Sequence, residues 1–319
     1  MTHPKVSVII PVFKAEKYIE KCARTLFGQT LDDMEYIFVD DCSPDRSIEV
    51  LERVLEDYPQ RKAQVKFLRH KENKGVSRSR QDGVDAATGE YLIHCDPDDW
   101  VEPDMYELMY TAAKDSDADI AYCDFMEEAP EKQLYHTQIL PDNKLELMLE
   151  VCSGQLHCAM WNKLISRKYI ENINRKFNPE LSLWEDMAYI VPLLLTPGRF
   201  VRIEKALYHY TILSDSITRK KTPRTVNSQI KAVENITTFI DSLQQAEQYE
   251  SMVQRLQLRS KDDYLRPGET YDPRLWRDTF PKIKMNFLNF PISYERKVLY
   301  MLCFLHIDIF VKAMVRLRD

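Results

Sequence analysis

The sequence predicts an α/β fold in which helices cover both faces of a doubly wound, mostly parallel sheet, followed by a helical C-terminal extension. In the first 125 residues, short apolar runs alternate with segments whose apolar residues recur at helical spacing. The first run, Val6–Val12 (VSVIIPV), is apolar at nearly every position, as in a strand covered on both faces. Strands that alternate with helices in this way are typical of a parallel sheet.

Five strands and four helices are expected in order in this first part. The strands are expected at residues 6–12, 36–39, 65–68, 91–95 and 120–125. The helices are expected at residues 16–27, 47–57, 77–87 and 103–114. Tyr18, Ile19, Cys22 and Leu26 form one apolar stripe on the first helix, and Pro103 suits the first turn of the last one.

The remainder of the chain has a less regular middle and a helical end. Residues 127–142 are polar and contain two prolines, which predicts a loop. Helices are expected at residues 145–151, 185–195, 226–243 and 249–264, and one strand at 201–210. We therefore expect three regions, at residues 1–125, 126–220 and 221–319.

Composition narrows the classes of protein that remain possible. The chain has 44 basic and 50 acidic residues and a net charge of −6, which disfavours a nucleic-acid partner. Its 7 glycines form neither G-x-G-x-x-G nor G-x-x-x-x-G-K-[ST], which excludes a dinucleotide fingerprint and a classical phosphate loop. Its 7 cysteines form no C-x-x-C pair and no signal peptide opens the sequence, so a reduced cytoplasmic location is expected.

Carboxylates follow two of the predicted strands, where the strands of a parallel sheet share one edge. Asp41 follows the second strand, and Asp96 and Asp98 follow the fourth. Clustered carboxylates repel one another unless a cation compensates them, and oxygen ligands suit Mg²⁺ or Mn²⁺. Asp98 is the main candidate ligand and Asp96 the second, whereas Asp41 suits hydrogen bonds from a base or ribose. The alternative for any single aspartate, and for Asp99 in particular, is a capping or turn residue.

A basic segment, NKGVSRSR at residues 73–80, joins the third strand to a helix. Its Arg80 is expected in the first turns of that helix, where it can contact a phosphate or the base of a nucleotide. For Arg78 a solvated basic face is the simpler interpretation.

Three strings occur in order within residues 5–125: VSVIIPVFKAEKYIEKCARTLFGQT, YIFVDDCSPDRS and NKGVSRSRQDGVDAATGEYLIHCDPDDWVEPDMYE. Together they resemble the nucleotide-binding half of a family 2 glycosyltransferase with the GT-A fold. The resemblance implies a nucleoside-diphosphate-sugar donor, a divalent metal at the DxD motif Asp96–Pro97–Asp98, and inversion at the anomeric carbon. It also implies that Pro11, Phe13 and Asp41 line the base and ribose pocket. The sequence departs from the family where Cys42 replaces the usual Gly or Asn, Pro97 replaces Ser and Gln81 replaces Asn.

Direct displacement at an anomeric carbon needs a base for the acceptor hydroxyl, which is usually a carboxylate. The segment LWEDM at residues 183–187 precedes an apolar helix, so its acids are expected at a helix N-terminus. Helix capping is the alternative interpretation. The resemblance implies that Asp186 is the catalytic base and that Glu185 orients the acceptor or the loop. Trp184 and Trp161 are candidates for contact with the acceptor sugar, with core packing as the alternative for both.

His209 lies where the resemblance places a third metal ligand or a diphosphate contact. The segment that follows is a candidate loop over the diphosphate, with Ser214, Asp215, Ser216 and Arg219.

The C-terminal segment 287–318 is strongly apolar, but His306, Asp308 and Lys312 interrupt it and make it too polar for a membrane span. Basic residues flank it, which favours an interfacial helix on an anionic membrane. A helix packed on the rest of the protein is the alternative.

These observations favour an inverting, metal-dependent glycosyltransferase that transfers a sugar from a nucleoside-diphosphate-sugar donor to a glycan or lipid-linked glycan acceptor. By analogy with family members of this size, the acceptor is expected to be a growing cell-surface glycan. The protein is expected in the cytoplasm, with a peripheral position on the inner face of the cell membrane as a further option. Two alternatives stay open. One is a sugar-nucleotide nucleotidyltransferase, and the other is a non-catalytic nucleotide-sugar-binding module.

Overall fold

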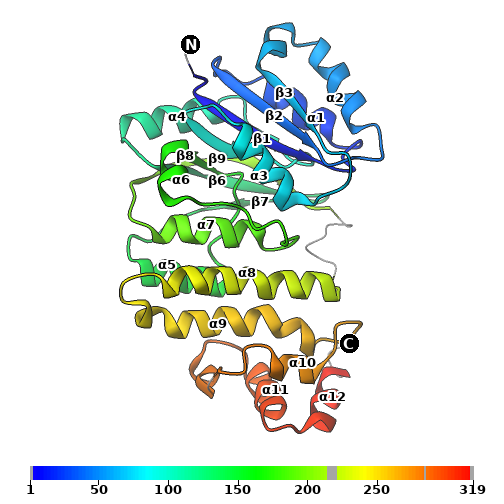
Figure 1. Ribbon diagram of the computed structural model, residues 1–319, viewed down its shortest axis with the longest axis vertical. Coiled ribbons are helices and arrows are strands. Elements are labelled where there is room, and N and C mark those ends of the chain that lie inside the picture. The colour runs from blue at the N-terminus through cyan, green and yellow to red at the C-terminus, as the bar shows by residue number, and fades with distance from the viewer. Residues whose placement is uncertain (1–2, 214–220, 284, 317–319) are drawn as a thin grey trace. The chain divides into compact units, whose positions relative to one another are not determined.

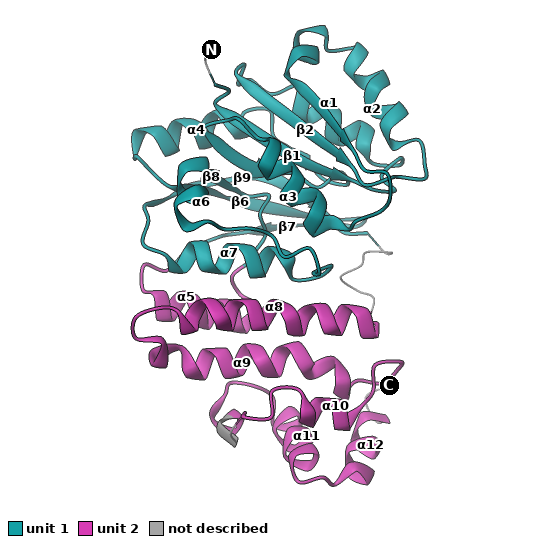
Figure 2. Ribbon diagram, in the orientation of Figure 1, with its two compact units in different colours: residues 1–140, 157–214 teal, residues 141–156, 215–319 magenta. Residues whose placement is uncertain are grey.

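The computed structural model describes residues 3–213, 221–283 and 285–316. The chain divides into two compact units, shown in one view in Figure 1 and coloured separately in Figure 2. The first unit comprises residues 1–140 and 157–214, and the second comprises residues 141–156 and 215–319. The predicted loop contacts at Ser214, Asp215, Ser216 and Arg219 lie outside the described residues.

The first unit contains one mixed sheet and the helices that cover it (Figure 1). Its strands are β1 (Val6–Val12), β2 (Met34–Asp40), β3 (Val65–Arg69), β4 (Tyr91–His94), β5 (Trp100–Val101), β6 (Ile120–Ala129), β7 (Lys132–His136), β8 (Lys163–Ser166) and β9 (Phe200–Thr211). Its helices are α1 (Ile19–Phe27), α2 (Ser47–Glu56), α3 (Val76–Ala86), α4 (Met105–Asp115), α6 (Arg167–Ile173) and α7 (Glu185–Leu195).

The strand order is β3-β2-β1-β4-β8-β6-β9-β5, and β7 pairs with β6. The first four strands in this order are parallel, and β6 is also parallel to β9. β8 runs antiparallel to β4 and β6, and β5 runs antiparallel to β9. The predicted fold class is therefore confirmed, with antiparallel strands inserted in the second half of the sheet.

Alternation along β1 explains why helices cover both faces of the sheet. Val8 and Ile10 point to one face and join the core formed with α1, α2 and α4. Ile9 points to the other face, where it packs closely against Gly83 of α3. All three side chains are buried, which explains the continuous apolar run in the sequence.

Parts of this unit differ from the sequence-based expectation. The predicted loop at 127–142 instead extends β6 to Ala129 and returns as β7, which pairs with it antiparallel. The strands β5 and β8 and the helix α6 have no counterpart among the expected elements. All three are short, and the polar β6–β7 hairpin has no apolar alternation that would reveal it.

Gly89 lies where the chain passes Ser7 too closely for any side chain. A Cβ atom added at Gly89 would lie 2.6 Å from Ser7 Oγ and 2.7 Å from the Ser7 backbone nitrogen. We expect Gly89→Ala to lower the free energy of unfolding by about 2–4 kcal/mol, because backbone atoms must move. Gly83→Ala should also destabilise the protein, because its Cβ would lie 2.3 Å from Cγ2 of the fully buried Ile9. Chemical denaturation measures the loss in Gly89→Ala, and a stability equal to that of the wild-type protein would contradict this assignment.

The second unit is helical and includes α5 (Lys144–Ser153), although this helix lies between strands in the sequence. Its other helices are α8 (Pro223–Asp241), α9 (Glu250–Lys261), α10 (Pro273–Asp278), α11 (Tyr294–Phe304) and α12 (Asp308–Arg316). The Arg259 guanidinium donates to the Val151 carbonyl at 2.9 Å, and the Cys152 thiol donates to the Met252 carbonyl at 3.2 Å. These bonds attach α5 to α9.

The apolar C-terminal segment forms two helices where one was expected. The chain turns between α11 and α12 at His306, whose φ of +59° lies in the left-handed region. Leu299, Tyr300 and Cys303 of α11 are buried in a core that also contains Trp276. None of the helices in the described ranges has both the length and the apolar character needed to cross a bilayer.

Candidate active site

The parallel strands β1, β2 and β4 end at the same edge of the sheet. Val12 pairs with Asp40 in register, and the Asp41 amide donates to the Val12 carbonyl at 3.0 Å. The Cys95 amide, just after β4, donates to the Ile9 carbonyl at 3.0 Å. The residues that follow these strands therefore gather at one edge, as the sequence predicts for Phe13, Asp41 and Asp96.

The segment Asp96–Asp99 directly after β4, termed the acidic turn, is held in place by hydrogen bonds to Asp99. The Tyr208 hydroxyl donates to Asp99 Oδ2 at 2.6 Å, and the Thr211 amide donates to Asp99 Oδ1 at 2.7 Å. The Asp96 amide in turn donates to the Tyr208 hydroxyl at 3.1 Å. Burial first, and then the charges of Asp98 and Asp96, raise the pKa of Asp99 well above its usual range. Asp99 is thus the turn residue that the sequence suggested, tied to β9.

Asp98 has a different environment from Asp96. In the described part of the chain, Asp96 forms an ion pair with Arg80, whereas Asp98 forms none. Burial and the neighbouring Asp96 raise the pKa of Asp98 to about 6. A carboxylate with a raised pKa beside a second carboxylate gains from a nearby cation. The turn is therefore electrostatically suited to a positive ligand.

The residues present fit a divalent cation shared with a substrate. Among the described residues, no group of three or more His, Cys, Asp or Glu side chains is arranged to enclose a metal ion. Mg²⁺ commonly binds through one or two carboxylates together with substrate phosphates. Asp98 and Asp96 would supply the two carboxylates, and a substrate phosphate and water would supply the remaining ligands.

Arg80 connects this turn to the second acidic segment. The guanidinium is buried, with 4% of the side chain exposed, and it donates to Asp96 and to Glu185 at 2.9 Å each. It also forms an ion pair with Asp186. Burial opposes the positive charge, but Asp96 and Glu185 outweigh it and raise the pKa of Arg80. Asp96 and Asp186, which are 90 positions apart in the sequence, therefore share one cation.

The acidic pair begins α7, as the sequence predicts. Trp184 immediately before it has φ +61°, in the left-handed region, which is unusual for a residue with a side chain. The turn places Glu185 and Asp186 in the first turn of the helix, where the helix dipole favours negative charge. Both carboxylates then face Arg80.

Asp41 holds the loop before α3 in place through hydrogen bonds. Its two oxygens accept hydrogen bonds from the Lys74 amide at 2.7 Å and the Gly75 amide at 2.8 Å. His70 Nδ1 lies 2.8 Å from Asp41 Oδ1, and His70 Nε2 lies 2.9 Å from Asp82. Sequence reasoning missed His70, because nothing in its local pattern indicates that it faces two carboxylates. Any contact of Asp41 with a base or ribose would share oxygens that these groups already use.

The end of β1 presents an aromatic face. Phe13 is 42% exposed, whereas Pro11 is buried within the strand. Pro11 lies beyond Ile9, the last β1 residue that pairs with β4, so its missing amide hydrogen interrupts no bond to β4. Cys42 has φ +56°, which accounts for the Gly or Asn that the family usually has there.

Trp161 does not face a sugar site in the structure. It is 2% exposed and stacks on Tyr208 with ring centroids 4.2 Å apart. Its ring also packs against Phe125, His157 and Tyr210, so the alternative of core packing describes Trp161 and the expected acceptor contact is corrected. Nearby Lys163 is also buried, and its ammonium donates to the Ala159 carbonyl and to Asn162 Oδ1 at 2.8 Å each. Burial lowers the pKa of Lys163 to about 8.

His209 lies between two glutamates. Its Nδ1 is 2.7 Å from Glu128 and its Nε2 is 2.9 Å from Glu102. The imidazole also stacks on Trp100 at a centroid distance of 3.4 Å. Both ring nitrogens are thus occupied, and metal ligation by His209 would require it to leave these carboxylates.

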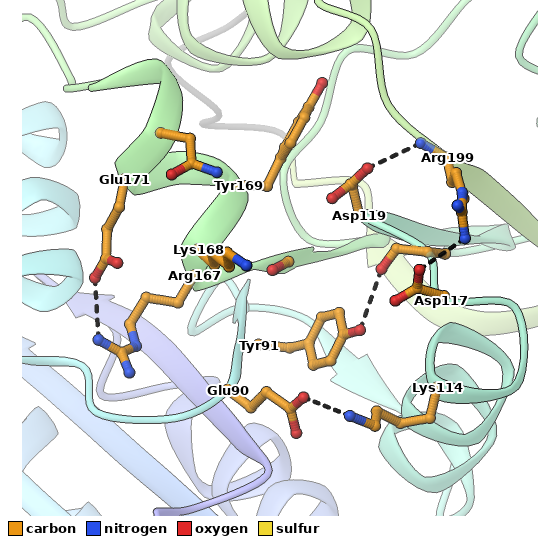
Figure 3. A pocket seen from close by; sticks show the side chains of 13 residues that line it. Glu90, Tyr91, Lys114, Asp117, Asp119, Arg167, Lys168, Tyr169, Glu171 and Arg199 are labelled. Atoms are coloured by element: carbon orange, nitrogen blue, oxygen red, sulfur yellow. Dashed lines mark hydrogen bonds and ion pairs between the residues drawn. The ribbon is translucent and has the colours of Figure 1, made fainter.

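A cavity of about 520 Å³ lies at the opposite edge of the sheet, beside the beginnings of β4 and β6 (Figure 3). Three of its cations pair with acids of the same wall: Lys114 with Glu90 at 2.6 Å, Arg167 with Glu171 at 3.0 Å and Arg199 with Asp117 at 2.7 Å. In open α/β sheets ligands bind at the carboxyl edge. We therefore assign the candidate active site to the edge that carries Asp96 and Asp98.

The family model for glycosyl transferase family 2 matches residues 7–173, which is more than half of the chain. The chain belongs to this family. EpsJ of Bacillus subtilis (strain 168), described as an uncharacterized glycosyltransferase, is 30% identical over 222 residues, covering 67% of this chain and 63% of that protein. YibD of Escherichia coli (strain K12), also an uncharacterized glycosyltransferase, is 31% identical over 227 residues, with coverage of 67% and 63%. The chain thus matches less than two thirds of the length of both relatives.

Solved structures of this glycosyltransferase fold resemble the whole chain. TarS 1–349 of S. aureus in complex with UDP-GlcNAc has a TM-score of 0.68 at 16% identity, covering 98% of this chain and 88% of that one. The mannosyltransferase PcManGT of Pyrobaculum calidifontis, in complex with GDP-Man and Mn2+, has a TM-score of 0.53 at 13% identity, with coverage of 99% and 84%. At these identities the likeness establishes the fold, which includes the helical C-terminal region.

Proposed function

We propose that this family 2 glycosyltransferase transfers a sugar from a nucleoside-diphosphate-sugar donor to a glycan hydroxyl, with a divalent metal and with inversion. The observation that carries the proposal is the convergence of Asp96, Asp98 and Asp186 at the carboxyl edge of the sheet, with Arg80 among them. A donor site and an acceptor base are needed within one substrate length for direct displacement. In this proposal residues 1–125 bind the donor and residues 126–220 bind the acceptor.

The donor side of the site uses the residues after β1, β2 and β4. Phe13 offers an exposed ring for the base, and Asp41 accepts hydrogen bonds from the backbone amides of the 74–75 loop. Asp98 and Asp96 would hold Mg²⁺ or Mn²⁺, which would neutralise the charge of the leaving diphosphate. Mn2+ accompanies GDP-Man in the PcManGT structure, which supports this choice for the present chain.

Asp186 is the base in this proposal. Its carboxylate lies in the first turn of α7 with 23% of the side chain exposed, so an acceptor hydroxyl can reach it. It takes the hydroxyl proton as the oxygen attacks the anomeric carbon from the face opposite the diphosphate, which inverts the configuration. Glu185 also accepts a hydrogen bond from Arg80, and it thereby keeps the guanidinium oriented toward Asp186. Trp184 directly precedes this first turn of α7.

A relative supports the proposed class of acceptor. Minor teichoic acid biosynthesis protein GgaB of Bacillus subtilis is 25% identical over 224 residues, covering 68% of this chain and 24% of that protein. We propose a glycan or lipid-linked glycan acceptor in the biosynthesis of a cell-surface polysaccharide for this chain as well. Nothing in the net charge of −6 favours a nucleic-acid partner.

The direct test is release of nucleoside diphosphate. The protein is incubated with Mn²⁺, a panel of nucleotide sugars and a mixture of glycan acceptors, and the released diphosphate and the glycosylated product are measured. Acceptor-dependent release supports the proposal. Pyrophosphate formed from a nucleoside triphosphate would favour a nucleotidyltransferase, and donor binding without any turnover would favour a binding module.

We also propose that the turn between α11 and α12 rests on an anionic membrane. Four apolar side chains, termed the apolar turn, are exposed there: Phe304, Leu305, Ile309 and Phe310. Ile309 is 77% exposed and Phe310 61% exposed. The acidic Asp308 within the turn pairs with Arg277 at 2.6 Å, while Lys312 and Arg316 are exposed on the following turns of α12. Apolar side chains flanked by cations suit the interface of an anionic bilayer.

Polar substitutions in the apolar turn should weaken membrane binding. We expect the L305S/I309S/F310S variant to bind anionic liposomes at least about tenfold more weakly than the wild-type protein, because less apolar area enters the bilayer. Co-sedimentation with phosphatidylglycerol vesicles measures it. Leu149→Ser removes another exposed leucine of the same unit and should leave binding unchanged. Equal binding of the triple variant and the wild-type protein would rule the contact out.

A further inference from the structure

Arg80 is the buried charge on which the donor side and the acceptor side of the site both depend. Its side chain comes from α3, and its Nη2 lies 2.9 Å from Asp96 Oδ1. Its Nη1 contacts Glu185 and Asp186. The guanidinium therefore bridges the turn after β4 and the first turn of α7.

Charge balance shows that this bridge is incomplete. One guanidinium faces three carboxylates, and Asp98 adds a fourth acid beside Asp96. The Arg80 Nε is buried and has no acceptor among the described residues. The cluster keeps an excess of negative charge that Arg80 only partly offsets.

The carboxylates are partly exposed while the cation is not. The side chains of Asp96, Glu185 and Asp186 are 24%, 12% and 23% exposed, against 4% for Arg80. A cation that enters from solvent therefore meets the carboxylates first, and it competes with Arg80 for Asp96. Such competition weakens binding of a metal ion that arrives alone, because each positive charge raises the cost of adding the next.

We propose that Arg80 is a positioning residue that competes with the divalent cation for Asp96 and holds Asp186 in place. The metal then binds well only together with the negatively charged diphosphate, which offsets the second positive charge. Arg80 keeps its contacts with Glu185 and Asp186 in that state, so the base stays oriented while the donor is bound. This inference rests on the proposed function, since it assumes that a metal and a diphosphate occupy this edge.

The first test measures Mn²⁺ binding without any nucleotide, by electron paramagnetic resonance of the free ion. Arg80→Gln should bind Mn²⁺ at least about tenfold more tightly than the wild-type protein, because the competing charge is gone. Arg78→Gln removes the same charge two positions away, from an exposed side chain paired with Asp82, and should change the affinity less than about twofold. A folded Arg80→Gln protein with unchanged or weaker Mn²⁺ affinity would overturn the proposal, whereas a merely structural role predicts no gain.

A second pair of variants covers the case in which Arg80→Gln does not fold. R80Q/E185Q removes one cation and one carboxylate, so the net charge of the cluster stays the same. It should bind Mn²⁺ at least about tenfold more tightly than E185Q alone, and equal affinities would contradict the competition. Addition of UDP or GDP should tighten Mn²⁺ binding more in the wild-type protein than in Arg80→Gln.

A separate experiment tests whether Arg80 positions Asp186. Arg80→Lys keeps the charge but replaces the planar fork by a single ammonium, which cannot bridge both sides. It should lower kcat by about tenfold to a hundredfold while the donor KM and the Mn²⁺ affinity stay close to wild type. A wild-type kcat in Arg80→Lys would show that Arg80 does not position Asp186. If Arg80→Gln binds Mn²⁺ more tightly but the wild-type protein turns over no donor, the competition at Asp96 is supported and the proposed function is contradicted.

Discussion

Asp186→Asn should lower kcat for sugar transfer by about a thousandfold while the protein still binds its donor. General base catalysis by a positioned carboxylate contributes typically about 10²–10⁴-fold, and an amide cannot accept the proton. Asn has the same shape and still offers one oxygen to Arg80, so the bridge to Glu185 and Asp96 is retained. Single-turnover assays with the cognate donor and acceptor measure the loss, and calorimetric titration measures donor affinity.

A matched control separates this effect from a general loss of an acid. Glu171→Gln also removes one carboxylate from a helix of the same unit, but it pairs with Arg167 at the opposite edge of the sheet. It should leave kcat within about twofold of the wild-type value. If Asp186→Asn transfers sugar at the wild-type rate, another residue acts as the base. Loss of donor binding would mean that Asp186 supports the structure of the donor site.

The first half of the fold was predictable because each of its elements carries a strong local pattern. β1 is apolar at nearly every position since both of its faces are covered, and α1 has a single apolar stripe. The second half was predicted less well. β8 is only four residues long, and the β6–β7 hairpin is polar and largely exposed at its tip, so neither has the periodicity that indicates a strand.

The candidate site was predictable to the extent that topology brings strand ends together. The clustering of Asp41 and Asp96 at one edge follows from the parallel order of β2, β1 and β4. The ion pairs of Arg80 could not be predicted, because Asp96 and Asp186 approach it from separate elements. Residue type also says little about orientation. An aromatic ring suits a sugar or a core equally well, and Trp161 stacks on Tyr208.

Asp98→Ala should lower kcat/KM for the donor by about a thousandfold, and removal of metal with EDTA should do the same to the wild-type protein. Loss of Lewis-acid stabilisation of a leaving diphosphate costs several kcal/mol, and each 1.36 kcal/mol is about tenfold in rate. Asp98 is the stronger candidate ligand since Asp96 is already paired with Arg80. Its pKa of about 6 reflects burial beside Asp96, a cost that a bound cation relieves. Mn²⁺ should restore the chelated wild-type protein but not the variant.

The control for this experiment is Asp115→Ala, which removes an exposed carboxylate at the end of α4. It should keep both activity and the response to Mn²⁺. Asp98→Ala should also lose Mn²⁺ binding in the presence of UDP or GDP, which separates a lost ligand from a damaged acceptor site. Diphosphate release that survives in Asp98→Ala, or in EDTA, would show that the acidic turn does not act through a metal. In that case Arg80, the buried cation beside Asp96, would be the candidate among the described residues to balance the leaving diphosphate.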